Sequence, residues 1–219
     1  ERARGLNYTE DLASPGTFCW DLSQAPATLI FAAQGHEQVL GAPNAPAESI
    51  AEGLRHREAQ RRSKFDHPLH RAADAYIVKR GEGNTIVAGY PWFTDWGRDT
   101  FIALRGLCLS TGRLEEARKI LVEWAGAVSG GMLPNFFSDT GAAPEYNSVD
   151  ASLWYVVAVH DYLQKTGASD STVESKLREA VGAILSGYAK GTRYHIQMDV
   201  DGLLAAGEDG VQLTWMDAK

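Results

Sequence analysis

GYPWFTDWGRDTFIAL, residues 89–104, gathers five aromatic residues, two carboxylates and an arginine where a loop turns into an apolar helix. Aromatic faces stack on the C–H faces of sugars, and an Asp beside an Arg offers charged hydrogen bonds to hydroxyl groups. A packed core does not need that mixture in so few positions. The stretch therefore predicts a site for a polyhydroxylated substrate, with these binding residues: Trp92, Asp95, Trp96, Arg98 and Asp99.

A simpler interpretation applies to Asp99. An acidic residue in the first turn of a helix complements the helix dipole, which stabilises the helix by about 0.3 kcal/mol or more without any ligand. The crowding of Trp96, Arg98 and Asp99 in one short segment favours the binding role instead.

Downstream, two kinds of helix alternate. Residues 98–110 and 148–163 are apolar nearly all round, so we expect both to be buried on every side. Residues 114–128 and 171–190 carry apolar side chains on one face, so we expect each to be half-buried, and residues 68–79 predict a further, mixed helix. The alternation predicts a mainly α fold in which outer helices wall inner ones, an (α/α)6 toroid. An ordinary helical bundle is the alternative.

The region before these helices has a different composition. Residues 1–47 are rich in Gly, Pro, Ala and Ser, and residues 29–33 (LIFAA) predict one short strand. Residues 47–62 are rich in Ala, Glu and Arg, which predicts an exposed helix. The N-terminal region is typical of a linker or of the end of a preceding β domain.

Three loops lead from an expected outer helix toward an inner one, at residues 89–97, 130–147 and 205–217. In a toroid these loops would lie at one end, where their aromatic, carboxylate and amide groups would form a pocket. The second loop and the helix start after it predict further hydroxyl-binding residues: Asn135, Tyr146, Asn147 and Asp150. Asp150 also suits the capped start of that helix, as Ser148 does.

The third loop supplies the candidate acid. Residues 211–215 alternate as a short strand would, and they bring Asp217 close to Trp215. A carboxyl group beside a large apolar ring stays protonated at higher pH, as a general acid must. We therefore expect Asp217 to be catalytic and Trp215 to bind substrate. Glu208 and Asp209 compete for the acid role, although both lie beside glycine in an expected solvated turn.

Composition excludes several classes of protein. The 219 residues are 44% hydrophobic and 22% charged, which is typical of a globular protein. The formal charge of −7 argues against a nucleic-acid partner but would not repel a neutral glucan. The longest apolar run, residues 153–159, is far shorter than the roughly 20 residues that span a bilayer, so no membrane association is expected. No secretory signal is apparent at the start.

The metal-binding and redox residues are sparse. Cys19 and Cys108 are far apart in the sequence, which argues against a disulfide framework or a metal cluster and favours reduced thiols in the cytoplasm. Asp139 and Glu145 lack the spacing of a calcium loop. We therefore expect no cofactor and no metal.

Several motifs resemble the glycogen debranching enzyme family, in its amylo-α-1,6-glucosidase domain. The matching segments run in order from about residue 66 to the end of the chain: residues 94–107, 133–135, 146–147, 150–151 and 214–219. The resemblance implies a toroid related to that of glucoamylases and an inverting hydrolysis of α-1,6-linked glucose. It also implies that Trp96, Arg98 and Asp99 bind the non-reducing glucose, and that Asp217 is the general acid. Glycogen or another branched α-glucan is then the expected partner.

The resemblance further implies a domain organisation. Residues 1–62 would be a linker and the end of a β-rich domain, and residues 63–219 the first half of the toroid. The general base would lie beyond Lys219, so we expect the chain alone to be inactive. A half ring would expose an apolar face, through which it could pair with a second copy. The alternatives are a non-catalytic carbohydrate-binding helical domain, or a related toroid glucosidase that acts on α-1,4-glucan or trehalose.

Overall fold

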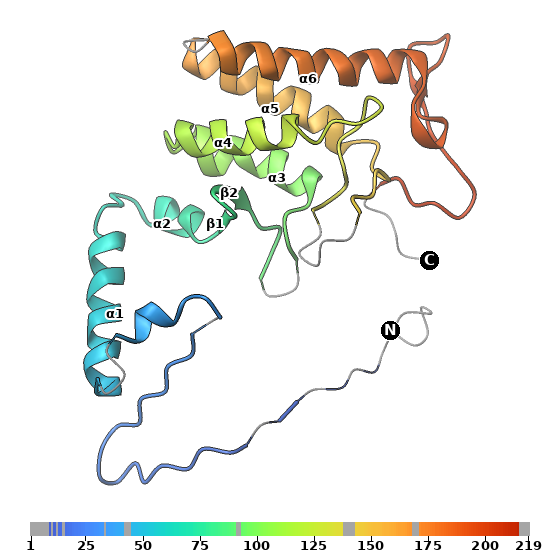
Figure 1. Cartoon of the computed structure of the whole chain (residues 1–219). Helices are drawn as coiled ribbons and strands as arrows, with labels where there is room; N and C mark the ends of the chain where they lie inside the picture. The colour runs from blue at the N-terminus through green and yellow to red at the C-terminus, as the bar shows by residue number, and fades with distance from the viewer. Residues whose placement is uncertain are drawn as a thin grey trace. The chain divides into compact units, whose positions relative to one another are not determined.

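The computed structural model (Figure 1) describes residues 9, 11, 13–14, 16–32, 34–41, 45–90, 93–137, 143–167 and 171–214. The chain divides into two compact units, Glu1–Pro68 and Leu69–Lys219. Described helices outnumber the short strands in both units together, so the prediction of a mainly α chain is confirmed.

The first unit contains a short 3-10 helix, η2 (Glu37–Leu40), and the helix α1 (Ala47–Arg62). The bounds of α1 are those that its composition predicts. Glu58 accepts hydrogen bonds from Arg61 and Arg62, which lower the pKa of the Glu58 carboxyl to about 2. The strand predicted at residues 29–33 is wrong for 29–32, the part that the structure describes, because no described segment pairs with that backbone.

Helix α2 (Pro68–Asp74) starts at the last residue of the first unit, and the strands β1 (Ile77–Arg80) and β2 (Gly83–Ile86) follow in the second. The strands form an antiparallel hairpin in which Arg80 pairs with Gly83 across a two-residue turn. Gly81 has a φ of +53°, which glycine adopts without steric cost. The helix predicted over residues 68–79 is therefore too long.

Four helices follow and lie side by side (Figure 1): α3 (Gly97–Leu104), α4 (Leu114–Ala125), α5 (Ala151–Thr166) and α6 (Ser171–Lys190). A π-helical turn, η3 (Arg105–Leu109), continues α3. Helix α3 packs on α5, and α4 packs on α5 and α6. After α6 come the 3-10 turn η4 (Arg193–His195) and the strands β3 (Gln197–Met198) and β4 (Leu204–Ala205). The strand predicted at 211–215 does not form in its described part, 211–214.

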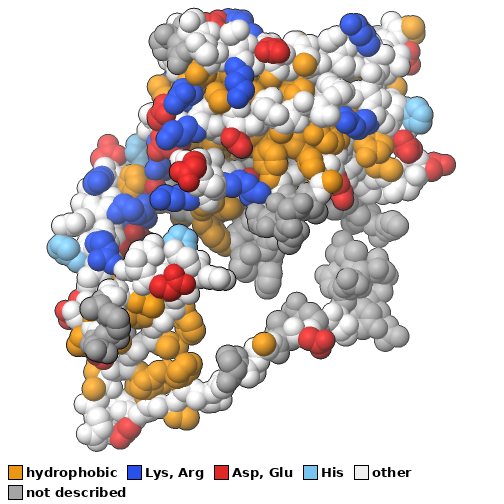
Figure 2. All heavy atoms as spheres, in the orientation of Figure 1, with side chains coloured by type: hydrophobic (Ala, Val, Ile, Leu, Met, Phe, Trp, Pro, Cys, Tyr) orange, Lys and Arg blue, Asp and Glu red, His pale blue; other side chains and the backbone are white. Residues whose placement is uncertain are grey.

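Helix α4 is amphipathic, as its sequence predicts. Its outward face carries Glu115, Arg118 and Lys119, in which Glu115 is paired with both basic residues. Figure 2 shows both signs of charge side by side over this part of the molecule. The opposite face of α4 is fully buried and includes Ile120 and Trp124.

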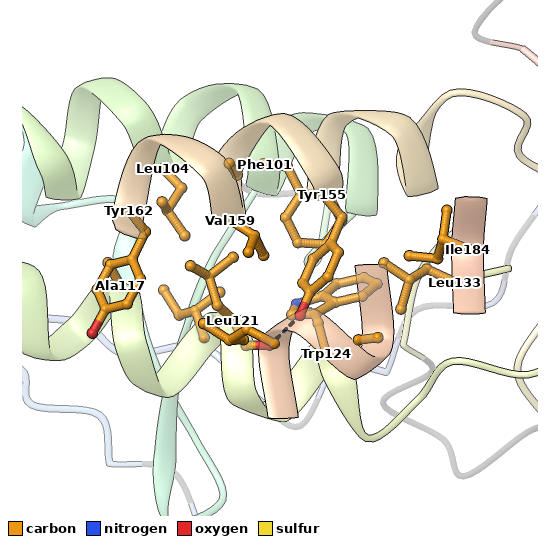
Figure 3. Packing of buried hydrophobic residues seen from close by; sticks show 14 of the residues in the cluster. Phe101, Leu104, Ala117, Leu121, Trp124, Leu133, Tyr155, Val159, Tyr162 and Ile184 are labelled. Carbon is orange, nitrogen blue, oxygen red and sulfur yellow. Dashed lines mark hydrogen bonds between the residues drawn. The ribbon is translucent and has the colours of Figure 1, made fainter. Parts of the chain in front are cut away.

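Aromatic and aliphatic side chains from α3, α4, α5 and α6 meet in one core (Figure 3). The ring of Phe101 packs edge-to-face on Trp124 and Tyr155, with centroid distances of 5.0 and 5.1 Å. The buried hydroxyl of Tyr155 donates to the backbone carbonyl of Leu121 at 3.0 Å, so this polar group is satisfied. The core therefore fixes α3 and α5, whose N-terminal ends carry the site.

The prediction that residues 98–110 and 148–163 are buried on every side is wrong for the described chain. Phe101 and Leu104 on α3 are fully buried, but Ile102 is 42% exposed, and Val157 on α5 is 37% exposed. Each of these two helices therefore keeps an apolar side chain that the described elements leave exposed.

Candidate functional site

The three predicted loops meet. Together they line a pocket of about 450 Å³, which we call the loop pocket. The first loop and the start of α3 contribute two aromatic side chains and two charged groups, the second loop contributes amides, and residues 212–214 close the third side. The residues are Ala88, Phe93, Trp96, Arg98, Asp99, Asn135, Phe136, Glu145, Asn147, Gln212 and Thr214.

Backbone hydrogen bonds fasten these loops to one another. The N–H of Gly97 donates to the carbonyl of Asn135 at 2.8 Å, and the N–H of Asn135 donates to the carbonyl of Glu145 at 2.7 Å. The third loop is bound to the segment before α5, because the N–H of Val149 donates to the backbone carbonyl of Leu213 at 2.9 Å. Satisfied backbone groups of this kind hold irregular segments in one conformation. These bonds hold the three loops together around the pocket.

The aromatic side of the loop pocket is made by Trp96 and Phe136. Their backbones form an isolated antiparallel bridge, and their rings stack with centroids 4.9 Å apart and an interplanar angle of 28°. Phe93 adds a ring that is 55% exposed. Flat, partly exposed rings of this kind suit the C–H face of a sugar.

Two glycines allow the elements around the pocket to approach closely. A Cβ on Gly97 would lie 3.1 Å from the Cβ of Ala151, so glycine lets the start of α3 lie against the start of α5. Gly131 has a φ of +77°, and a Cβ there would lie 2.7 Å from the Cα of Gly187 on α6. These contacts bring the second loop and both helix ends to one place.

Arg98 and Asp150 form the charged base of the site. The guanidinium of Arg98 donates from Nε and Nη2 to the two carboxylate oxygens of Asp150, the second at 2.7 Å. Burial would raise the pKa of Asp150, but the hydrogen bonds and charge of Arg98, with a hydrogen bond from Ser148, hold it below its ordinary value of 3.8. Arg98 and Asp150 lie on α3 and beside the start of α5, so the pair also joins the two helices.

Asp99 and Asn147 present polar atoms to the pocket. Asp99 lies in the first turn of α3, is exposed, and makes no side-chain hydrogen bond or ion pair with the residues that the structure describes. The Oδ1 atom of Asn147 is buried and has no hydrogen-bond partner among the described residues. A buried acceptor without a partner costs free energy, which a ligand hydroxyl would recover.

Five of the predicted binding residues therefore line one pocket: Trp96, Arg98, Asp99, Asn135 and Asn147. Asp150 lies behind Arg98 and is not among the lining residues. Trp92, Trp215 and the predicted acid Asp217 lie outside the described residues, so their roles stay predictions.

Asp95 and Tyr146 lie outside the pocket lining. The carboxylate of Asp95 has no exposed surface and accepts hydrogen bonds from Arg80 at 3.1 Å and Thr85 at 2.9 Å. The hydroxyl of Tyr146 donates to a backbone carbonyl at 3.2 Å, and the guanidinium of Arg193 lies 4.2 Å from its ring centroid. Both side chains support the loops in this structure, so we leave them out of the proposed binding set.

Phe136, Glu145 and Gln212 line the pocket but were not predicted as binding residues. Phe136 directly follows Asn135, and the predicted convergence of loops could have suggested it. Glu145 was considered only as a calcium ligand, and Gln212 carried no signal of its own. No group of three or more His, Cys, Asp or Glu side chains in the described chain is placed to hold a metal ion.

Comparison with known proteins agrees with this geometry. A family model described as Amylo-alpha-1,6-glucosidase matches residues 71–219, which include every residue of the loop pocket. The chain belongs to the amylo-alpha-1,6-glucosidase family. It is also 28% identical to the glycogen debranching enzyme of Saccharomyces cerevisiae (strain ATCC 204508 / S288c), over 61% of this chain. The match covers 12% of that relative, so the chain spans a small part of its length.

The matched region begins within α2 and runs to the end of the second unit. Among the described helices of this amylo-alpha-1,6-glucosidase family member, none combines the length and apolar character needed to cross a bilayer.

Proposed function

We infer that this chain carries the glucose-binding subsite and the general acid of an enzyme that hydrolyses α-1,6-glucosidic branch linkages in glycogen. The observation that supports this most is the convergence of Trp96, Arg98, Asp99, Asn135 and Asn147 on one pocket within the matched region. The partner would be glycogen or a similar branched α-glucan, and no cofactor is required.

Each part of the pocket has a task in this proposal. A non-reducing glucose stacks on the rings of Trp96 and Phe136, which form the apolar side of the pocket. The carboxylate of Asp99 accepts hydrogen bonds from two of its hydroxyls, and the buried Oδ1 of Asn147 accepts another. Arg98, held by Asp150, keeps a fixed positive charge at the base of the pocket.

Bond cleavage needs a proton donor and a base. Asp217 would protonate the glycosidic oxygen, and Trp215 would keep its carboxyl group neutral until then. A second carboxylate about 6.5–9.5 Å away would activate a water on the opposite face of the sugar and so invert the anomeric centre. None of the carboxylates that we assign to glucose binding or to Arg98 is free for that task.

The proposal extends to architecture and location. The exposed apolar residues Ile102 on α3 and Val157 on α5 suit the inner helices of an (α/α)6 toroid, which further helices would cover. A second copy of the chain could cover the same surface as a homo-oligomer. A cytoplasmic location is consistent with the two separate cysteines, Cys19 and Cys108.

The test uses a complete protein that contains this chain, with a limit dextrin as substrate. We expect released glucose, and we expect Asp217→Asn to reduce kcat by about 10²–10⁴-fold, as the loss of a general acid does. Asp209→Asn is the matched control and should keep normal turnover, because Asp209 lies in an exposed turn.

Normal turnover by Asp217→Asn would move the acid role to Glu208 or Asp209 and overturn this assignment. Binding of the dextrin without any release of glucose would instead favour the non-catalytic carbohydrate-binding alternative. Release of glucose from trehalose or linear α-1,4-glucan at a higher kcat/KM than from the dextrin would favour the related toroid glucosidases.

A further inference from the structure

A second pocket, of about 680 Å³, lies on the other side of the wall that closes the loop pocket. The wall consists of residues 95–96 and 136–137, which are bridged between Trp96 and Phe136. Successive side chains of extended backbone point to opposite faces. Trp96 and Phe136 accordingly line the loop pocket, whereas Asp95 and Phe137 line the second pocket, which we call the hairpin pocket.

The inner end of the hairpin pocket is held rigidly. Asp95 is fully buried and paired with Arg80 of β1, whose guanidinium carbon lies 5.5 Å from the centroid of the Phe137 ring. That ring in turn packs against the buried Trp124 at a centroid distance of 4.3 Å. These contacts join Asp95, Arg80, Phe137 and Trp124 in one packed group at the inner end of the pocket.

The remaining lining combines apolar surface with polar groups. Phe137, Val122 and Pro144 form an apolar side. Asn84 of β2 and Glu123 of α4 add a carboxamide and an exposed carboxylate, neither of which is hydrogen-bonded through its side chain to another described residue. An apolar surface facing amide and carboxylate groups suits a sugar ring, which has a C–H face and a rim of hydroxyls.

The charges of the hairpin pocket balance. Its lining contains three basic side chains and three acidic ones: Arg80, Arg118, Lys119, Glu82, Asp95 and Glu123. Figure 2 shows basic and acidic side chains mixed over α4 and the hairpin. A phosphate or a cationic ligand would meet as many like charges as opposite ones, so the electrostatics favour a neutral ligand.

We propose that the hairpin pocket is an accessory subsite for a second segment of the same neutral α-glucan whose terminal glucose occupies the loop pocket. The proposal rests on the proposed function. A branched glucan offers two neighbouring chain segments, and the two pockets are separated only by the wall. Holding a second segment raises the effective concentration of the branch at the loop pocket without touching the reacting bond. The hairpin pocket should therefore change KM and leave kcat unaltered.

The experiment compares two substrates on a complete protein that contains this chain. The large substrate is a glycogen limit dextrin, and the small one is a short oligosaccharide with a single α-1,6-linked glucose. Asn84→Ala and Glu123→Ala each remove one group that would hydrogen-bond the glucan, and Asn84→Trp fills the pocket. We expect KM for the dextrin to rise about two- to tenfold, with kcat unchanged and KM for the short substrate unchanged. Glu179→Ala, an exposed Glu on α6, is the matched control.

Equal KM values for wild type and all three variants on the dextrin would overturn the accessory subsite while leaving the proposed function intact. A rise in KM for both substrates together would also overturn it, because the change would then act through the wall on the loop pocket. An absence of glucose release from wild type on either substrate would contradict the proposed function itself. Competition by inorganic phosphate at the hairpin pocket would show that it prefers an anion and is not a glucan site.

Discussion

The ion pair between Arg98 and Asp150 should be the strongest single link between α3 and α5. Its side chains are only 17% and 27% exposed, and the guanidinium donates two hydrogen bonds to one carboxylate. Hydrogen bonds to charged groups contribute about 1.5–3 kcal/mol each, and partial exposure reduces the total. We expect a coupling free energy of about 1.5–3 kcal/mol for the pair.

The chain provides a matched control on the same elements. Arg105 of η3 donates to Asp161 of α5 at 2.5 Å, but these side chains are 46% and 31% exposed. Exposed pairs contribute about 0.2–1 kcal/mol because water and salt screen them. The two pairs have the same residue types, so their difference reports the lower exposure of the Arg98–Asp150 pair together with its second hydrogen bond.

The assay is a pair of double-mutant cycles in urea, with Arg98→Gln and Asp150→Asn in one, and Arg105→Gln and Asp161→Asn in the other. The buried Trp124 provides a fluorescence signal of unfolding. We expect the first cycle to give the larger coupling, and the second to shrink further in 0.5 M salt as exposed pairs do. Equal couplings in the two cycles, or a first coupling near zero, would refute the claim that Asp150 fixes Arg98.

Three further predictions follow from single contacts. Gly131→Ala should lower the free energy of unfolding by about 1–3 kcal/mol more than Gly112→Ala, which thermal melting can measure. Both residues have a φ of +77°, but only a Cβ at Gly131 would meet other backbone, the Cα of Gly187 at 2.7 Å. Ellman's reagent should modify the exposed Cys19 in the native chain and not Cys108, since burial and the charge of Glu116 raise the pKa of the Cys108 thiol to about 12. Modification of both thiols would contradict the burial of Cys108. Because the folded pKa of Asp150 lies below 3.8, its contribution to stability is present above about pH 4 and is lost as the pH falls through the folded pKa. Asp150→Asn should therefore flatten the acid side of the stability profile measured by urea titration.

Local patterns in the sequence predict the helices well. The spacing of apolar residues predicts the half-buried helices α4 and α6, and composition predicts α1. Both signals depend only on residues that are neighbours in the sequence. The β1–β2 hairpin was missed because residues 68–79 also allow a helix, although Gly81 beside a β-branched run carried a turn signal. The exposed Ile102 was missed because an apolar residue in a helix does not reveal which sides other elements cover.

The site was predictable where the residue types within one loop indicate a binding role. Trp96, Asp99 and Asn147 stand out by residue type and position, and the alternation of helices predicts that their loops meet. The partner of Arg98 was not predictable, because its neighbour Asp99 is a carboxylate and the actual partner lies 52 residues away. The inward direction of Asp95 was missed for a related reason, since the wall depends on a bridge between distant segments.

The central claim is that the loop pocket binds the terminal glucose of a branched glucan through Asp99. Calorimetric titration of a glucose-shaped inhibitor, 1-deoxynojirimycin, into a complete protein that contains this chain tests it most directly. Asp99→Ala removes both hydrogen bonds that the carboxylate would accept, and losing even one charged hydrogen bond should weaken binding about 10- to 150-fold, while Glu179→Ala should bind as wild type does. Unchanged affinity in Asp99→Ala would contradict the account and leave Asp99 as a partner of the helix dipole alone.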